Sequence, residues 1–195
     1  MKQSHAADDS PDLTSPAVLS ALLRRHGLHT KKGLGQHLLV DRDALEAIVA
    51  AVGLGIEDAP DAVLEVGAGP GALTVELAHR ARRVIAVELD HAMVGVLHET
   101  TARFDNVEII EGDLLKVDPE AVFGVEPYLL AANLPYYITA AALRHFIEAT
   151  HSPRRMVVMT QREVAERMVA APGAMSLLSV SVQFYGRPTL VRRVP

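Results

Sequence analysis

The sequence predicts an α/β fold with a mostly parallel sheet that is covered by helices on both faces. Five short apolar runs alternate along the chain with segments of helical periodicity, which is typical of such sheets. The runs are nearly continuous rather than alternating with polar residues, as expected for strands buried on both sides. The length of 195 residues suits one domain, and a hydrophobic content of 49% is enough for a core.

The first elements precede the sheet. Residues 1–15 are small, polar and acidic, so we expect a disordered tail. Ser15 is a suitable N-cap for a helix over 16–27, which begins with proline and ends with glycine. Asp41 favours a second helix, which is expected to end at a glycine at position 53.

The remaining elements alternate. Short apolar runs predict strands at 62–66, 84–89, 107–110, 128–132 and 156–160. Helical periodicity is found at 72–80, 91–102, 139–149 and 161–170. The segment 177–185 fits either a strand or a helical face, and 189–194 is typical of a last strand.

The composition excludes several kinds of chemistry and indicates where in the cell the protein is found. The absence of cysteine excludes disulfides, thiolate metal ligands and cysteine nucleophiles. No apolar run approaches the roughly 20 residues that cross a bilayer, and the N-terminus has no apolar signal segment. We therefore expect a cytoplasmic monomer that needs neither a membrane nor a metal.

The charge of the chain is unevenly distributed. The net charge is −5, but residues 43–150 carry 18 acidic against six basic residues. Residues 151–195 carry seven basic against two acidic residues. Such asymmetry indicates either a face for an anionic partner or simply an uneven solvated surface.

A glycine-rich loop with the sequence EVGAGPG occupies residues 65–71 and connects the first strand of the predicted sheet to a helix. Glycine permits a tight turn there and lets a ligand approach the backbone closely. The next strand ends at Glu88, 21 residues after Gly67, where a carboxylate can accept both ribose hydroxyls of an adenosine cofactor. Without Glu88, an ordinary strand-to-helix turn would explain the loop equally well.

The glycine spacing distinguishes between cofactors. A dinucleotide fingerprint is G-x-G-x-x-G, whereas this loop has G-x-G-x-G with Glu65 two residues before the first glycine. The loop resembles motif I of S-adenosylmethionine (SAM) methyltransferases, in which Glu65, Gly69 and Gly71 would support the site. The same pattern implies that Asp113, after the third strand, accepts a hydrogen bond from the cofactor's adenine. A nicotinamide-dependent dehydrogenase is the less favoured alternative.

The fourth strand leads into Asn133-Leu134-Pro135-Tyr136, which resembles motif IV of adenine amino-group methyltransferases. The Asn133 side-chain oxygen and the Leu134 carbonyl could accept the two amine hydrogens and direct the nitrogen lone pair at a methyl group. Pro135 makes the turn rigid. Tyr136 offers a face for a stacked base, worth about 1–3 kcal/mol. A proline turn beside a core tyrosine is the structural alternative.

Several motifs occur in a fixed order. Residues 31–39 (KKGLGQHLL) are similar to a G-Q-N-F-L motif, and EVGAGPG, VELD, GDLL, NLPY and the QREVAER segment of residues 161–167 follow. The chain thereby resembles the KsgA/Erm family of rRNA adenine N(6)-dimethyltransferases from about residue 25 to 195. The resemblance implies a Rossmann-like SAM-dependent methyltransferase fold, in which 177–185 is a helix.

The resemblance also assigns cofactor and partner. It implies that SAM is the cofactor and that small-subunit rRNA or the pre-ribosomal small subunit is the partner. It implies cofactor contacts from the following residues: His37, Leu39, Gly67, Glu88, Asp113 and Asn133. Basic residues could contact phosphates, namely Arg24, Arg25, Lys31, Lys32, Arg154 and Arg155.

The sequence departs from the family pattern at three places. His37-Leu38 replaces Asn-Phe, residues 174–180 lack a glycine and an arginine of the pattern, and the chain stops where the family continues with F-F-P-P-P-K-V. We therefore expect a C-terminally truncated catalytic domain over 16–195, without the last strand and the helical domain. A non-catalytic RNA-binding or ribosome-assembly factor on the same scaffold is the alternative.

Overall fold

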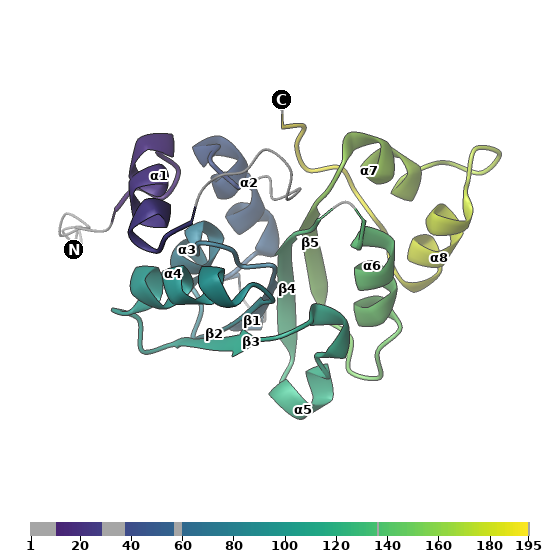
Figure 1. Cartoon of the computed structure of the whole chain (residues 1–195). Helices are drawn as coiled ribbons and strands as arrows, with labels where there is room; N and C mark the ends of the chain where they lie inside the picture. The colour runs from purple at the N-terminus through teal and green to yellow at the C-terminus, as the bar shows by residue number, and fades with distance from the viewer. Residues whose placement is uncertain (1–10, 29–37, 57–59, 136, 195) are drawn as a thin grey trace, which may run out of the picture.

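A five-stranded sheet forms the centre of the protein (Figure 1), and its strand order is β3-β2-β1-β4-β5. The computed structural model describes residues 11–28, 38–56, 60–135 and 137–194. The strands are β1 (Ala62–Val66), β2 (Arg83–Glu88), β3 (Val107–Glu111), β4 (Tyr128–Asn133) and β5 (Arg155–Met159). Each neighbouring pair is parallel, so the carboxyl ends of the strands meet at one edge.

Two helices precede the first strand, and at least one helix follows each strand. They are α1 (Pro16–Arg25), α2 (Arg42–Val52), α3 (Ala72–Ala78), α4 (His91–Thr101), α5 (Pro119–Phe123), α6 (Thr139–Ile147), α7 (Arg162–Met168) and α8 (Leu177–Tyr185), with the 3-10 helix η1 (Leu114–Lys116) after β3. Among the helices of the described residues, none has the length and apolar character to cross a membrane.

The sheet has a separate apolar core on each face. Val63 of β1 packs with residues of α2 and α3, whereas its neighbour Leu64 packs with residues of α5 and α6. This alternation follows from the period of two along a strand. Helix α1 does not pack on the sheet itself. Its residues Leu19, Leu22 and Leu23 pack against helices α3 and α4. Both faces are therefore covered, as the sequence predicts.

The caps of α2 show how local sequence sets an element. The Asp41 side chain accepts a hydrogen bond from the Ala44 amide at 2.9 Å, and Gly53 ends the helix with a φ of 78°. The Arg155 guanidinium, at the amino end of β5, donates to the carbonyls of Ala51 and Val52 at 3.1 and 3.4 Å. Helix α2 is thereby tied to the edge strand of the sheet.

The predicted strands of the sheet are confirmed to within one residue at each end, and 177–185 is a helix. The strand predicted at 189–194 is wrong. This segment is exposed and pairs with none of the described strands. Ion pairs hold it instead, from Arg192 to Asp43 at 3.0 Å and from Arg193 to Glu166 at 3.4 Å.

Two further details differ from the sequence analysis. Residues 11–15 were assigned to the tail, yet Leu13 is only 6% exposed and packs beside α1. Asp12 accepts hydrogen bonds from the amide and hydroxyl of Thr14 and pairs with Arg42 at 2.7 Å. Helices η1 and α5 were not predicted, because each is a single short turn started by an aspartate cap.

Candidate active site

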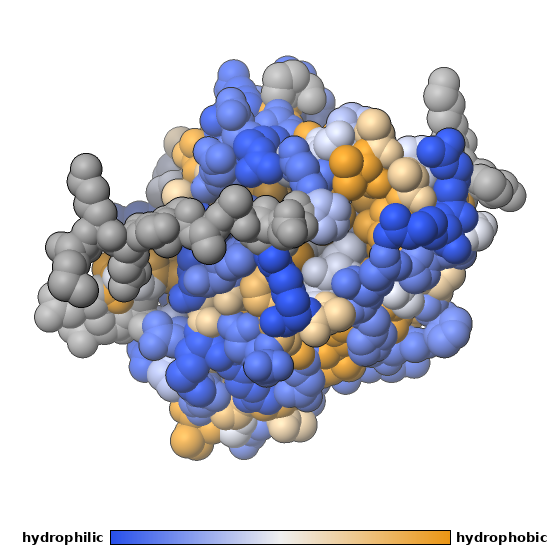
Figure 2. All heavy atoms as spheres, turned by 90° about the vertical axis from the view of Figure 1, so that its left-hand side faces the viewer, coloured by the Kyte–Doolittle hydropathy of each residue, from blue (hydrophilic) through white to orange (hydrophobic). Residues whose placement is uncertain are grey.

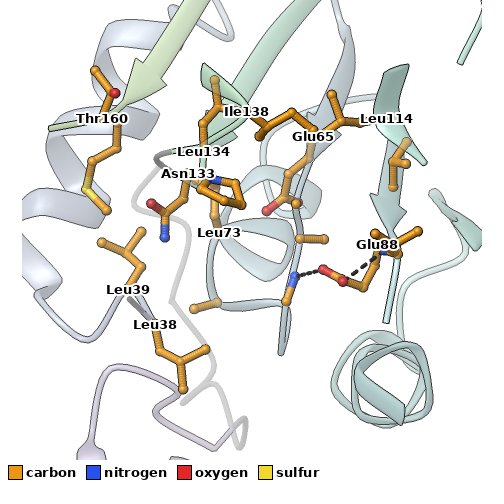
Figure 3. Close-up of a pocket in the computed structure, with 18 of the residues that line it drawn as sticks. Leu38, Leu39, Glu65, Leu73, Glu88, Leu114, Asn133, Leu134, Ile138 and Thr160 are labelled. Carbon is orange, nitrogen blue, oxygen red and sulfur yellow. Dashed lines mark hydrogen bonds between the residues drawn. The ribbon is translucent and has the colours of Figure 1, made fainter. Parts of the chain in front are cut away.

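A cavity of about 930 Å³ opens at the carboxyl edge of the sheet, where ligands bind in open α/β folds (Figure 3). Its volume is typical of small-molecule sites. Most of the predicted site residues line it, namely Leu39, Glu65, Gly67, Gly69, Glu88, Asp113, Asn133, Leu134 and Pro135. His37 and Tyr136 lie outside the described residues.

Gly67 brings the glycine loop against the end of β4. Its φ is 75°, which L side chains rarely adopt, and a Cβ there would be 3.4 Å from the Asn133 carbonyl oxygen. The Gly67 amide donates to the Val87 carbonyl at 2.9 Å, so the loop is also fixed to β2. The first glycine therefore lies against the ends of β1, β2 and β4 at the cavity.

Gly71 has a different role from the first two glycines. It does not line the cavity. Its φ is 90°, and a Cβ there would be 2.7 Å from Thr100 Oγ1 and 2.8 Å from Leu97 Cδ1 on α4. The third glycine thus allows the start of α3 to pack closely on α4, and its support of the site is indirect.

Glu88 is fixed by the backbone around it. Its side chain is buried; Oε2 accepts from the Gly69 amide at 2.8 Å, and Oε1 accepts from the amides of Leu89 and Asp90, each at 2.9 Å. A carboxylate has about four acceptor positions, so one is left in this arrangement. Contact with both ribose hydroxyls would therefore require one backbone bond to be shared or released.

Asp113 lies at the carboxyl end of β3. Its Oδ1 accepts from the Leu115 amide at 3.0 Å and caps η1. The preceding Gly112 donates its amide to the Glu88 carbonyl at 2.8 Å, which joins the ends of β2 and β3. The two acidic residues predicted to contact the cofactor therefore stand on adjacent strand ends of one cavity.

Leu134 and Pro135, which directly follow β4, are held by hydrogen bonds on both sides. The Leu134 amide donates to the Met159 carbonyl of β5 at 3.1 Å, and the Leu134 side chain is buried in the core below the sheet. The Pro135 carbonyl accepts from the Ile138 amide and the Thr139 hydroxyl, both at 3.1 Å. In Figure 3 the Asn133 amide extends from the strand end into the space beside Leu39.

Glu65 has a buried carboxyl group that lines the cavity. It lies in β1, is 2% exposed, and its Oε2 has no hydrogen-bond partner among the described residues. Burial raises the pKa of Glu65 to about 8; the Thr74 hydroxyl opposes this rise, and the negative charge of Glu88 adds to it. The Glu65 side chain is therefore mostly neutral at pH 7.

The lining of the cavity is strongly acidic. Arg162 is the one basic residue among the described residues that line it. Besides the mostly neutral Glu65, the acidic ones are Asp41, Glu88, Asp90, Asp113 and Glu163. A cavity with this balance suits a cationic ligand better than an anionic one. The described residues contain no group of three or more metal-ligating side chains.

Some lining residues were missed from the sequence. Gln161, Arg162 and Glu163 border the cavity directly after β5. They were noted only as part of a family motif, although the carboxyl-edge rule that located Asn133 applies to them as well. Tyr137, 82% exposed, also lines the cavity and follows the predicted stacking residue in the sequence.

The candidate phosphate contacts are not gathered in one place. Arg154 and Arg155 lie at the amino end of β5, opposite the cavity, and Arg155 bonds the end of α2. Arg25 pairs with Glu99 on α4. Lys31 and Lys32 lie outside the described residues.

A comparison with family models supports the motif order found in the sequence. The model of a family described as "Ribosomal RNA adenine dimethylase" matches residues 27–195. The chain belongs to this family. The match includes every strand of the sheet and the whole described part of the cavity.

Members of this family with similar sequences carry the name "Ribosomal RNA small subunit methyltransferase A". The protein of Dehalococcoides mccartyi (strain CBDB1) is 48% identical over 187 residues, which are 95% of this chain and 62% of the relative. The protein of Leuconostoc citreum (strain KM20) is 42% identical over 96% of this chain and 65% of the relative. The chain therefore spans a little under two thirds of the length of these curated relatives.

Solved structures agree with the family. The crystal structure of the 23S rRNA methyltransferase ErmE matches with a TM-score of 0.62 and 32% identity, over 72% of this chain and 54% of that chain. A dimethyladenosine transferase from Plasmodium falciparum matches with a TM-score of 0.61 and 30% identity, over 73% of this chain and 50% of that chain. The Rossmann-like methyltransferase fold expected from the sequence is confirmed.

Proposed function

We propose that this chain carries the catalytic site of an rRNA adenine N(6)-dimethyltransferase that uses SAM and acts on small-subunit rRNA. One structural observation supports the proposal in addition to the family match. Asn133, Leu134 and Pro135, at the end of β4, line the same cavity as Glu88 and Asp113. A methyl donor held by the two acidic residues and an adenine held by Asn133 would share one enclosed space.

The residues present fit the cofactor. SAM carries a sulfonium and an ammonium group, and the acidic lining complements this positive charge. Gly67 leaves the space beside the Asn133 carbonyl free of a side chain. A nicotinamide dinucleotide would bring two phosphates into a cavity where Arg162 is the single basic residue of the described lining. The charge of the site therefore favours SAM over a dinucleotide.

The protein's own contribution is alignment and electrostatics. An exocyclic adenine amine is a weak nucleophile because its lone pair is delocalised into the ring. Asn133 and the Leu134 carbonyl would accept its hydrogens and keep the lone pair directed into the cavity. Bound SAM supplies the methyl group, and the proton of the methylated amine leaves to water. The backbone hydrogen bonds of Leu134 and Pro135 would keep both acceptors in place.

Calorimetry with SAM and NAD, followed by transfer of tritiated methyl groups to unmodified small subunits, tests the proposal. We expect tight binding of SAM alone and labelled dimethyladenosine in the RNA. SAM binding without methyl transfer would support the non-catalytic assembly factor instead. Binding of NAD in preference to SAM would contradict the proposed function entirely.

The predicted role of Glu88 has a separate test. Glu88→Ala removes a ribose acceptor and also the anchor of the Gly69 amide, so we expect SAM affinity to fall by roughly tenfold or more, in line with about 1.5–3 kcal/mol for a charged hydrogen bond. Glu88→Gln keeps one acceptor oxygen and should bind with intermediate affinity. An unchanged dissociation constant in both variants would exclude the ribose contact.

A further inference from the structure

Two threonine hydroxyls form a hydrogen-bonded chain beside the cavity. Thr160, directly after β5, donates from Oγ1 to Oγ1 of Thr139 at 3.3 Å, and Thr139 donates to the Pro135 carbonyl at 3.1 Å. Thr160 lines the cavity, whereas Thr139, the first residue of α6, is only 1% exposed. In Figure 3 Asn133 lies between Thr160 on one side of the cavity and Glu88 on the other. The chain of hydroxyls therefore links the cavity wall to the backbone that follows β4.

The Pro135 carbonyl is fully used by this arrangement. It accepts from the Ile138 amide at 3.1 Å as well as from the Thr139 hydroxyl, and a carbonyl oxygen has two lone pairs. No backbone amide in the described part of the chain donates to the neighbouring Leu134 carbonyl. Of these two carbonyls, the one of Leu134 is therefore the one available to a substrate amine.

The orientation of the Leu134 carbonyl is set from both sides. On one side, the Leu134 amide is bound to the Met159 carbonyl of β5 at 3.1 Å. On the other side, the proline ring fixes φ of Pro135, and two donors hold the Pro135 carbonyl. Strand β5 thus holds this short segment twice, directly through Met159 and, by way of Thr139, through Thr160.

A threonine hydroxyl often bonds the carbonyl four residues before it in a helix, and α4 contains such a case. Thr101 Oγ1 donates to the Leu97 carbonyl at 2.7 Å, and Thr101 is 4% exposed. Thr139 differs from it because its acceptor precedes the helix and lines the cavity, and because a second hydroxyl donates to it from the end of β5. The ordinary local role of such a bond does not account for this link to β5.

We propose that Thr139 and Thr160 are positioning residues for methyl transfer, which hold the backbone after Asn133 so that the Leu134 carbonyl faces the substrate amine. This inference rests on the proposed function. Thr160 acts through Thr139, and Thr139 acts through the Pro135 carbonyl. A misplaced acceptor weakens alignment in the transition state and not the binding of the methyl donor. Loss of either hydroxyl should therefore lower kcat and leave the affinity for SAM unchanged.

Valine substitutions remove each hydroxyl and keep the branched shape of the side chain. We expect Thr139→Val to lower kcat for methyl transfer by roughly threefold to tenfold, as the loss of one hydrogen bond implies, with an unchanged SAM dissociation constant. Thr160→Val should lower kcat less, because the Pro135 carbonyl keeps both donors. Thr139→Ser retains the hydroxyl and should restore turnover. The double valine variant should be no slower than Thr139→Val, since Thr160 acts through Thr139.

Thr101→Val is the matched control. It removes a buried hydroxyl that also bonds the carbonyl four residues before it, and Thr101 is not among the described residues that line the cavity. We expect a loss of stability similar to that of Thr139→Val, measured by urea unfolding, but no change in kcat. An equal fall in kcat in the two variants, or turnover of Thr139→Val at the wild-type rate, would overturn the inference.

A second readout needs neither substrate nor turnover. The ¹³C carbonyl resonance of Pro135 reports the hydrogen bonds of this carbonyl in the free protein. It should move upfield in Thr139→Val, less in Thr160→Val and not in Thr101→Val. A resonance that stays in place in Thr139→Val would overturn this inference and leave the proposed function intact. A wild-type protein that transfers no methyl group would overturn both.

Discussion

Single glycines in the loop after β1 serve different purposes. Gly67 and Gly69 line the cavity, whereas Gly71 contacts α4 from the start of α3. All three have positive φ values, so conformation alone does not distinguish them. The space around each residue does, because a Cβ would meet no atom within 4 Å at Gly69 but would clash at Gly71.

We therefore expect unequal costs for two alanine substitutions. Gly71→Ala combines backbone strain with overpacking against Thr100 and Leu97 and should lower the free energy of unfolding by about 2–4 kcal/mol. Gly69→Ala adds strain alone, about 1–2 kcal/mol. Urea unfolding of both variants provides the comparison. Equal destabilisation would contradict the assignment of Gly71 to helix packing.

Glu65 should make the stability of the ligand-free protein depend on pH. Its pKa is about 8 in the folded state against an ordinary value of 4.5, so between these values the folded protein holds a proton that the unfolded chain has lost. Stability contributed by that proton is present at low pH and is lost as the pH rises toward 8, by up to about 1.4 kcal/mol per pH unit.

Urea unfolding at pH 5.5 and 8 tests this dependence. Glu65→Gln removes the titrating group and keeps its shape, so the variant should gain stability relative to wild type as the pH rises. Other titrating residues are common to both proteins and cancel in the difference. A difference between the two proteins that does not change with pH would show that Glu65 titrates normally.

At the level of elements, the edge strand β5 supports α2 through one side chain. Arg155 donates to the last carbonyls of α2, which a helix leaves without intrahelical partners. Within the described part of the chain, the adjacent Arg154 donates only its backbone amide, to the Tyr128 carbonyl. Two neighbouring basic residues that look equivalent in the sequence therefore have different structural roles.

These two arginines form a matched pair for mutation. Arg155→Ala should lower the free energy of unfolding by about 1 kcal/mol, since an exposed charged hydrogen bond is weaker than a buried one. Arg154→Ala should change it by less than about 0.5 kcal/mol. Chemical denaturation of both variants measures the contrast. A larger effect from Arg154→Ala would refute the role of Arg155 at the helix end.

The sequence predicted well those elements whose own residues show a clear pattern of apolar side chains. Continuous apolar runs located all five strands. The inner strands β1, β2 and β4 are almost entirely buried, whereas the edge strands β3 and β5 are only partly buried. The segment 189–194 has a strand-like composition, but a strand also needs a hydrogen-bonded neighbour, and composition does not reveal whether one is available. Leu13 was assigned to the tail because a single apolar residue in a polar stretch has no periodicity.

The site was predictable where residues follow strand ends. Glu88, Asp113 and Asn133 could be located because parallel strands end at one edge of the sheet. The packing of Gly71 on α4 and the hydrogen bond from the Gly69 amide to Glu88 depend on distances between segments far apart in the chain. Sequence patterns do not contain those distances.

At the scale of the whole molecule, charge is segregated. The cavity edge is acidic, whereas arginines are found around α1 and in the C-terminal segment. In Figure 2, which looks at the side that carries α1 and α4, hydrophilic side chains cover much of the surface. The acidic cavity suits a cationic cofactor. Three of these arginines, Arg25, Arg192 and Arg193, are paired with carboxylates.

The central claim is that Asn133 aligns an adenine amine in the cavity where SAM binds. The most direct measurement compares methyl transfer to small-subunit rRNA with SAM affinity, both for wild type and for Asn133→Ala and Asn133→Asp. We predict that Asn133→Ala binds SAM within a few-fold of wild type but transfers methyl groups roughly 10²-fold more slowly, and that Asn133→Asp, which keeps an acceptor oxygen, is affected less. Transfer by Asn133→Ala at the wild-type rate would contradict the account.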